Sequence, residues 1–565
     1  MKDFLSFTSI FATEPRKILK CNIDGFEFRC SYKLSNMSLD KMIDNSKENE
    51  YGKLSGALDY SKVRTCDTRL SDRELAYLYH DVRGLYGALK KSYLDEDSLI
   101  TIPLTSTGYV RRDCRSAMRD NPQNRRTFLN SRLSPSDYTL LKDLERGGNT
   151  ASYRGCAGRL LHNIFCYDEA SAYPYVMCCR KFPKGRFQQV GHLTRDRFRK
   201  LIECKACMFY VTFTNLKLKP NIPIPYISYS KCLQSDREND IVFNGRVIEA
   251  RLIRMAVNEI DFKIIESQYD YDKKILIDSF RFSELDYLPD ELTDTIKLYF
   301  QKKCELKGVD DYLYAKSKNK LNGIFGMGCT SPVRDIVTYN QESHEWKKEA
   351  PDLGDALNKF YDSWNSFLMP TIGAWTTAHA RKHLQDILDV SGEHTVYCDT
   401  DSDKCTIDLS FWTNKRNAEI MEECECFGAY GIDNEGEKLY MGIYEQEPTY
   451  DSFVTWGAKK YAYRIGSKIV TTIAGVNKKS GSAYLKSIGG LSNFNLGLIF
   501  PQEHSGRNTA YYDERAVHER TITDYQGNTS TFLTASSIAL ESATYELGAT
   551  NDFLEIADIN ELTFI

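Results

Sequence analysis

The chain has 565 residues, a formal net charge of −4 and a hydrophobic fraction of 42%. At roughly 150 residues per domain, this length predicts about four domain-sized parts. A slightly acidic chain is not expected to coat nucleic acid by charge alone, because phosphate binding depends on Lys and Arg. No segment approaches the roughly 18 consecutive apolar residues of a membrane span, so we expect a soluble, cytoplasmic protein, which we take to be a monomer.

The 17 cysteines are mostly single residues on apolar segments, which indicates a reducing environment rather than a disulfide framework. Cys204 and Cys207 form a CxxC pair, and Cys424 and Cys426 form a CxC pair. Neither pair has a second pair at the spacing of a zinc site. We therefore expect no metal at either position.

The first apolar segment, Phe4–Phe11, is expected to be a buried strand, because Asp3 and the interleaved Ser and Thr are atypical of a secretory signal. Further along, residues 109–132 contain seven arginines and only two acidic residues. This basic patch predicts contact with a DNA strand, although an ordinary solvated surface has the same composition. Its arginines are Arg111, Arg112, Arg115, Arg119, Arg125, Arg126 and Arg132.

Residues 160–168 are predicted to form a buried strand that ends at an acid, Asp168, and is followed by a turn at Pro174. Residues 310–325 are predicted to form a helix. On that helix Lys318, Asn322 and Phe325 are spaced at i, i+4 and i+7, so they share one face. These side chains could contact a triphosphate and a base pair.

Residues 394–407 are predicted to form a hairpin whose turn holds Asp399 and Asp401. In extended geometry two acids at this spacing lie on the same face, where their charges repel each other unless cations compensate. Phosphoryl transfer by two divalent ions, roughly 3.5–4 Å apart, requires such carboxylates from separate segments to converge. A solvated turn is the alternative explanation, but the apolar strand before it disfavours that view.

In this order, the segments resemble the motifs of family B DNA polymerases. DEASAYP at 168–174 is similar to motif A (DxxSLYP), KNKLNGIFG at 318–326 to motif B (KxxxNSxYG), YCDTDS at 397–402 to motif C (YxDTDS), and KKY at 459–461 to the KxY motif. The resemblance implies an α+β right-hand polymerase with palm, fingers and thumb and an antiparallel palm sheet, preceded by a truncated RNase H-like exonuclease remnant.

The same resemblance assigns roles to individual residues. It implies that Asp168, Asp399 and Asp401 are the catalytic and metal-binding acids. It implies nucleotide-binding roles for Ser171, Tyr173 (a steric gate against ribonucleotides), Lys318 (a triphosphate ligand), Asn322 and Phe325. It implies primer or DNA contacts for Lys459 and Tyr461, and with the basic patch and linker we add Arg111, Arg112, Tyr153 and Gly155. Ala172, Gly323 and Phe325 depart from the family's usual Leu, Ser and Tyr.

The spacing of the motifs narrows the subfamily. Asp168 and Lys318 are 150 positions apart (318 − 168), and Asn322 and Asp399 are 77 apart (399 − 322). Both gaps resemble those of protein-primed polymerases of bacteriophages and linear plasmids, which carry one insertion for the terminal protein and one for processivity. YRGCAG at 153–158 is similar to their YxGG linker, and AGVNKKSG at 474–481 resembles the start of their thumb.

These resemblances give the following expected domains: a truncated exonuclease-like region and linker at 1–150, palm at 151–177, a terminal-protein-region insertion at 178–295, fingers at 296–327, a second insertion at 328–360, palm at 361–470, and thumb and C-terminal region at 471–565.

The exonuclease part is expected to be incomplete. Tyr77 and Asp81 resemble the last exonuclease motif, YxxxD. The DxE pair before it, Asp72 and Glu74, lies in a polar stretch next to Tyr77 rather than on an upstream strand. Because a single acid cannot organise two metal ions, we expect no proofreading by this chain.

We therefore expect a DNA-directed DNA polymerase that uses two Mg²⁺ ions, for which Mn²⁺ can substitute. Its expected partners are a DNA template-primer, deoxynucleoside triphosphates and a terminal protein that supplies the priming hydroxyl. Two alternatives are a degenerate polymerase acting as a DNA-binding scaffold, and a reverse transcriptase or RNA polymerase with a similar palm. Retention of all three acids disfavours the scaffold, and Tyr173 with the DTD form of the hairpin disfavours the second.

Overall fold

The computed structural model describes residues 7–14, 18–23, 25–35, 37–44, 51–52, 54, 68–90, 93, 97–236, 239–340, 345–505, 507–512, 517–523, 529–535 and 538–548. The chain forms two compact units. Unit 1 consists of Met1–Arg112, Val333–Asp352 and Asn508–Ala543, and unit 2 of Asp113–Pro332, Leu353–Arg507 and Thr544–Ile565. The domains expected from the sequence were mostly continuous segments, whereas each unit combines three, and the boundaries given above stay predictions.

Unit 1 is built from small antiparallel sheets and short helices. Phe4–Ser6 lie outside the described residues. The expected N-terminal strand is present as β1 (Phe7–Ala12), but the expectation that it is buried is wrong, because Phe11 is 47% exposed. It pairs with β2 (Ile18–Ile23), which pairs with β3 (Phe26–Arg29). The other elements are α1 (Ser31–Ser35), α2 (Leu39–Asp44), α3 (Asp72–Leu89), the hairpin β13 (Ile336–Asn340) and β14 (Glu345–Glu349), and β23 (Arg507–Tyr512), β24 (Val517–Thr523), β25 (Thr529–Ala535) and β26 (Ile538–Ala543).

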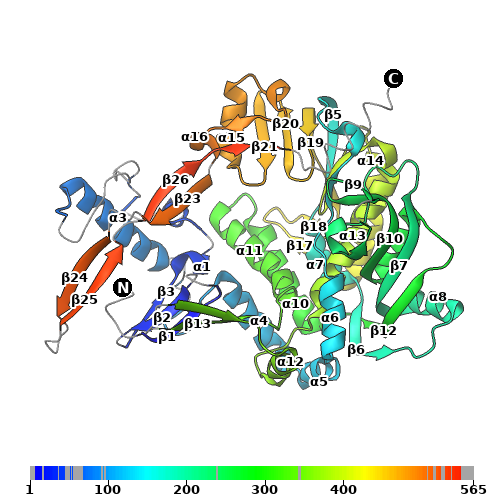
Figure 1. Ribbon diagram of the computed structural model, residues 1–565, viewed down its shortest axis with the longest axis horizontal. Coiled ribbons are helices and arrows are strands. Elements are labelled where there is room, and N and C mark those ends of the chain that lie inside the picture. The colour runs from blue at the N-terminus through cyan, green and yellow to red at the C-terminus, as the bar shows by residue number, and fades with distance from the viewer. Residues whose placement is uncertain are drawn as a thin grey trace. The chain divides into compact units, whose positions relative to one another are not determined.

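The central sheet of unit 2 has seven antiparallel strands in the order β21-β20-β19-β5-β16-β15-β4. Figure 1 labels four of them, β21, β20, β19 and β5. The predicted strand at 160–168 is β5 (Leu161–Glu169), and the predicted hairpin is β15 (Thr395–Asp399) with β16 (Ser402–Cys405). Both predictions are confirmed. The remaining strands are β4 (Thr150–Ser152), β19 (Tyr444–Thr455), β20 (Lys460–Ile465) and β21 (Lys468–Ile473).

Helices pack against this sheet and fix its central strands. The longest, α13 (Thr371–Ser391), begins after Pro370 and buries most of its residues, which include Trp375 and Arg381. It contacts α7 (Ala172–Cys179), which directly follows β5. A further helix here is α14 (Ser410–Phe427), whereas α6 (Pro135–Leu144) packs on β7 (Ala206–Leu218) and β10 (Arg246–Asn258) of a second sheet. Pro at the first turn and a Ser134–Asp137 capping box explain why α6 begins where it does.

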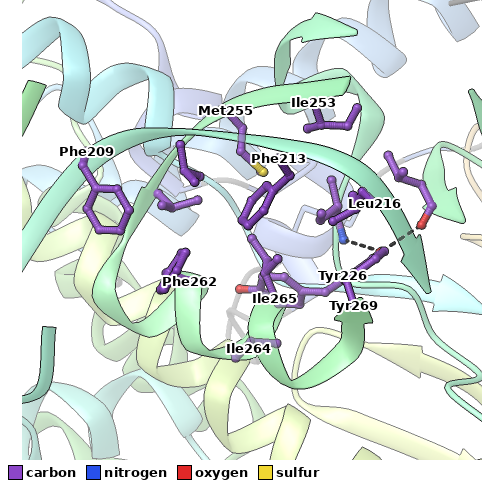
Figure 2. Packing of buried hydrophobic residues seen from close by; sticks show 14 of the residues in the cluster. Phe209, Phe213, Leu216, Tyr226, Ile253, Met255, Phe262, Ile264, Ile265 and Tyr269 are labelled. Atoms are coloured by element: carbon purple, nitrogen blue, oxygen red, sulfur yellow. Dashed lines mark hydrogen bonds between the residues drawn. The ribbon is translucent and has the colours of Figure 1, made fainter. Parts of the chain in front are cut away.

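A second sheet is inserted between α7 and the next long helix, with the order β6-β12-β7-β10-β8. One face is covered by an apolar cluster in which Phe209 and Phe213 of β7 meet Phe262 of α9 (Figure 2). Because these side chains are removed from water, the insertion has a core of its own. Its elements are β6 (Phe182–Gln189), α8 (Arg195–Cys204), β7 (Ala206–Leu218), β8 (Cys232–Ser235), β9 (Ile241–Phe243), β10 (Arg246–Asn258), α9 (Glu259–Gln268), β11 (Tyr269–Asp270) and β12 (Leu276–Asp286).

Two long helices, α10 (Asp290–Leu306) and α11 (Asp311–Gly328), pack side by side and face the central sheet (Figure 1). The predicted helix at 310–325 is confirmed by α11. Three helices lie at the other end of α10: α4 (Ser106–Asp120), α5 (Pro122–Asn130) and α12 (Leu353–Asp362). No helix of the described residues combines the length and the apolar character that a membrane crossing requires.

The C-terminal part of unit 2 packs on β20 and β21 around a small apolar core that includes Leu485, Phe494 and Phe500. It consists of short elements. Their bounds are α15 (Lys478–Ser487), β22 (Ile499–Phe500), α16 (Gln502–Ser505) and β27 (Tyr545–Glu546). The hairpin of β17 (Tyr430–Ile432) and β18 (Lys438–Tyr440) is separate from this part and packs against α10.

Candidate active site

A cavity of about 410 Å³ lies between the central sheet and the helices α10 and α11. Its sheet side carries the acids Asp168, Asp401 and Glu445, while its helix side carries lysines. The lysines are Lys303, Lys307 and Lys318. A cavity with one acidic wall and one basic wall can hold a polyanion whose charge is balanced by cations on the acidic side.

Asp168 lies near the end of β5, where Ser402 and Glu445 are its partners on the two neighbouring strands. Burial, and next the negative charge of Asp401, raise the pKa of Asp168 to about 7. The chain leaves the strand through Ser171, which has a left-handed backbone (φ 56°), and enters α7 immediately afterwards. Such strain in a non-glycine residue is tolerated where the surrounding structure fixes it, commonly at functional sites.

The turn between β15 and β16 separates the two acids of the hairpin. Thr400 adopts a left-handed backbone (φ 66°), and its N–H donates to the Asn149 carbonyl at 2.7 Å. Asp401 then lines the cavity, and its pKa is raised to about 6, first by burial and next by Glu169. Asp399 instead accepts hydrogen bonds from Lys459 Nζ (2.5 Å) and Thr150 Oγ1 (3.0 Å).

The expectation of an extended backbone between Asp399 and Asp401 is therefore wrong, although the charge of Asp399 contributes to the raised pKa of Asp401 after burial and Glu169, as expected of two neighbouring acids. The backbone between them is a turn rather than an extended strand, so the alternation of strand side chains does not apply. The structure brings Asp168 and Asp401 to one cavity and places Asp399 in an ion pair with Lys459. The metal-binding role of Asp399 stays a prediction.

The predicted face of the helix is confirmed, because Lys318, Asn322 and Phe325 all line the cavity. Phe325 stacks on Tyr173 with ring centroids 4.0 Å apart and an interplanar angle of 30°. Burial, and next the charge of Asp401, raise the pKa of Tyr173 to about 12, so its hydroxyl stays protonated at neutral pH. The two aromatic rings close the space between α7 and α11.

Lys303 is a site residue that motif analysis missed. It lies on α10, one helix before the motif, and its Nζ donates to Ser171 Oγ at 2.9 Å. Burial lowers its pKa, and Lys318 is among the charges that act on it. A lysine inside an amphipathic helix carries no local sequence signal, so only the packing of α10 against the cavity could identify it.

The predicted primer residues lie beside the hairpin. Lys459 has a left-handed backbone (φ 55°), and its N–H donates to Tyr397 Oη at 3.0 Å. Tyr461 is 8% exposed, and its ring packs against Tyr397 with centroids 4.7 Å apart. Lys459 thus connects the turn between β19 and β20 with Asp399, while Tyr461 contributes mainly to the sheet's core.

A buried polar network supports β5 behind the cavity. Glu169 is 2% exposed, and its Oε1 lies 3.3 Å from His383 Nδ1. The other ring nitrogen of His383 lies 3.2 Å from Arg180 Nη2, and Arg180 is ion-paired with Glu423. Burial raises the pKa of Glu169 to about 8 and lowers that of His383 to about 3, so both are expected to be neutral near pH 7.

The remaining predicted DNA contacts lie outside the cavity lining. Arg112 forms an ion pair with Asp97 and lies over the Tyr109 ring at 5.1 Å. Arg111 precedes it on α4. In the linker, Tyr153 N–H donates to the Val396 carbonyl at 2.9 Å, and a side chain at Gly155 would approach the Tyr153 ring to 3.0 Å.

The four residues considered for an exonuclease all lie on one helix, α3. Glu74 accepts from the Ser71 backbone N–H at 2.8 Å and closes a capping box, so it stabilises the start of the helix. Asp72 is the first residue of that helix, and Tyr77 and Asp81 follow. Within the part of the chain that the structure describes, these acids therefore do not lie on a strand.

The cavity acids fit divalent cations of the Mg²⁺ type. Asp168 and Asp401 are hard oxygen donors, and their pKa values are raised first by burial and next by the negative charge of neighbouring acids. Among the described residues, no group of three or more His, Cys, Asp and Glu side chains is arranged to hold a metal alone. A two-carboxylate site matches Mg²⁺, which completes its coordination with water and substrate phosphates.

Comparison with known proteins decides the family. Residues 13–406 match the family described as DNA polymerase type B, organellar and viral. The chain belongs to this family. The segments that resemble motifs A, B and C of this type B polymerase all lie within the matched residues and contribute to one cavity. The KxY segment at 459–461 lies outside the matched residues. No curated protein matches the sequence.

The fold of this type B polymerase is similar to that of Phi29 DNA polymerase. In its ternary complex with primer-template DNA and incoming nucleotide substrates, the Phi29 enzyme matches with a TM-score of 0.65 and 15% identity, over 95% of this chain and 84% of that one. The Phi29 enzyme in its complex with single-stranded DNA matches with a TM-score of 0.62 and 14% identity, over 95% of this chain and 84% of that one. The expected α+β right-hand fold with an antiparallel palm sheet is therefore confirmed.

Proposed function

We propose that this chain is a DNA-directed DNA polymerase that replicates a viral or plasmid genome by two-metal transfer of nucleotides to a primer hydroxyl. The observation that carries the proposal is the cavity in which Asp168 and Asp401 face Lys303 and Lys318. An incoming deoxynucleoside triphosphate placed there has its phosphates between the lysines and the acids. Divalent ions, when bound, neutralise phosphate charge and activate the attacking hydroxyl.

The residues of the chain position the substrate for this reaction. Lys318 and Lys303 bind the triphosphate from the helix side. Tyr173 is held by its stacking on Phe325, and we assign it the role of excluding a ribose 2′-hydroxyl of the incoming nucleotide. Lys459 holds Asp399 through an ion pair, and we assign it to the primer terminus because it lies beside the acidic hairpin.

Primer extension tests the proposal directly. On a recessed template with Mg²⁺ and deoxynucleotides, wild type is expected to extend the primer and Asp401→Asn to lose extension. Asp196→Asn is the matched control, because Asp196 is an exposed acid on α8 outside the cavity. Extension by Asp401→Asn at the wild-type rate would contradict the assignment of the site.

Sugar selection distinguishes a DNA polymerase from an RNA polymerase with a similar palm. We expect wild type to reject ribonucleotides. Because Tyr173→Val removes the ring that stacks on Phe325, this variant should incorporate more ribonucleotides than wild type. Equal use of both sugars by wild type would support the alternative.

We also propose that priming uses a terminal protein and that the chain does not proofread. The inserted sheet at β6–β12 and the hairpin β13–β14 occupy the two long gaps between motifs, which supports the first part. The capping role of Glu74 supports the second. Addition of a candidate terminal protein should start synthesis without a DNA primer, and incubation without nucleotides should leave the 3′ end intact.

A further inference from the structure

A second cavity, of about 350 Å³, lies in unit 2 between α4, α5 and the loop that follows α12, and it shares no lining residue with the active-site cavity. We name it the arginine–tryptophan pocket. Its lining includes no acidic residue. The residues that define it are Arg115, Arg119, Arg125, Arg126, Trp364 and Phe367.

Trp364 is presented to solvent in a fixed orientation. The residue is 67% exposed, which is unusual for so large an apolar side chain. The guanidinium groups of Arg119 and Arg125 lie over its ring at 5.9 Å and 5.6 Å. The same two arginines donate to the Trp364 carbonyl (3.1 Å) and the Ser366 carbonyl (3.0 Å). The ring is therefore held in place before any ligand arrives.

The other two arginines leave positive charge unsatisfied. Arg115 Nε is buried and has no hydrogen-bond partner among the described residues. Arg126 is exposed and forms neither a hydrogen bond nor an ion pair with the part of the chain that the structure describes. Burial lowers the pKa of both Arg115 and Arg125, so an anion in the pocket would relieve a real electrostatic cost.

We infer that the arginine–tryptophan pocket binds single-stranded DNA of the template overhang, with a base stacked on Trp364 and phosphates held by Arg115 and Arg126. An exposed aromatic ring among cations, without acids, is the arrangement by which proteins bind single strands regardless of sequence. A duplex does not offer an unstacked base to the ring, whereas the uncopied template always does. The inference rests on the proposed function, because it takes the polymerase's own template as the ligand.

The test measures the binding of labelled primer-templates by fluorescence anisotropy in the absence of nucleotides. One primer-template has a long oligo(dT) 5′ overhang, and in the other the overhang is trimmed to a single nucleotide. Trp364→Ala is expected to weaken binding of the long overhang roughly fivefold or more, since stacking of each base contributes that much or more. Arg126→Ala should weaken it and reduce the salt slope by about one unit. Neither variant should change binding of the trimmed overhang.

Controls separate stacking from folding. Phe411→Ala removes an aromatic residue of α14 that is 88% exposed and should leave binding unchanged. Trp364→Phe should retain most of the affinity, and thermal melting should show that each variant folds like wild type. Wild-type affinity for the long overhang in both Trp364→Ala and Arg126→Ala would overturn the inference.

The inference would also be overturned if the variants bound the long overhang like wild type and bound only a displaced non-template strand, or only a protein primer, more weakly. Primer extension on the trimmed overhang, measured in parallel, reports on the proposed function independently. Absence of extension with intact overhang binding would refute the polymerase activity rather than the pocket.

Discussion

Replacement of Asp401 by asparagine tests whether the cavity acids carry uncompensated charge. In the folded chain the pKa of Asp401 is raised from 3.8 to about 6 and that of Asp168 to about 7. A raised carboxyl pKa contributes stability that is fully present below pH 3.8 and is lost as the pH rises through the folded value. At pH 8 without metal, both acids therefore destabilise the fold.

The magnitude follows from the shift. About two pKa units at Asp401 correspond to at most about 3 kcal/mol, because one unit is worth about 1.4 kcal/mol. The neutral amide of Asp401→Asn would not carry this cost, and the substitution would also remove a charge that raises the pKa of Asp168. In a chain of this length, about 3 kcal/mol corresponds to a rise of a few degrees in Tm.

Differential scanning fluorimetry in EDTA measures the effect. We expect Asp401→Asn to melt above wild type at pH 8 and close to it at pH 4, with Asp196→Asn matching wild type throughout. Mg²⁺ should raise the Tm of wild type at pH 8 and raise that of Asp401→Asn less. An equal response of both proteins to Mg²⁺, or no gain in Tm at pH 8, would refute the reasoning.

Three further predictions concern single contacts. Gly148→Ala places a Cβ 2.5 Å from Thr400 Cγ2, so kcat should fall roughly 10- to 100-fold by displacement of the acidic turn while Tm changes little; an unchanged kcat would show that the turn adapts. Arg381→Met leaves the buried carboxylate of Asp261 unpaired and should cost about 3–5 kcal/mol in urea unfolding, whereas a cost near zero would mean that water reaches the pair. Lys303→Ala should raise the KM for deoxynucleotides roughly tenfold or more in steady-state titrations, with partial recovery in Lys303→Arg, and an unchanged KM would exclude triphosphate contact.

Local sequence patterns were enough to predict those elements of the site whose residues lie close together in the sequence. The apolar run before Asp168, the i, i+4 and i+7 spacing from Lys318, and the hairpin around Asp401 each predicted an element that the structure contains. Strand and helix periodicities act within a few residues, and the sequence displays them directly. Their order along the chain also indicated the family.

Tertiary packing decided what the patterns could not. The left-handed backbone of Thr400, fixed by the Asn149 carbonyl, sends Asp399 to Lys459 and Asp401 to the cavity, although the two acids look equivalent in sequence. Contacts of this kind join segments far apart in the chain, so no local period encodes them.

The basic patch shows the same limit. Its composition predicted contact with a DNA strand throughout. Arg125 instead donates to the carbonyls of Tyr361 in α12 and Ser366 after it, and Arg132 pairs with Asp362, while Arg126 remains exposed. The sequence by itself predicted the polymerase family and the acids Asp168 and Asp401 that line the cavity, and it located the positive charge. Only the tertiary structure decided which charges are used within the fold and which remain available to a ligand, because a charge is neutralised by whatever folding brings within a few ångströms of it.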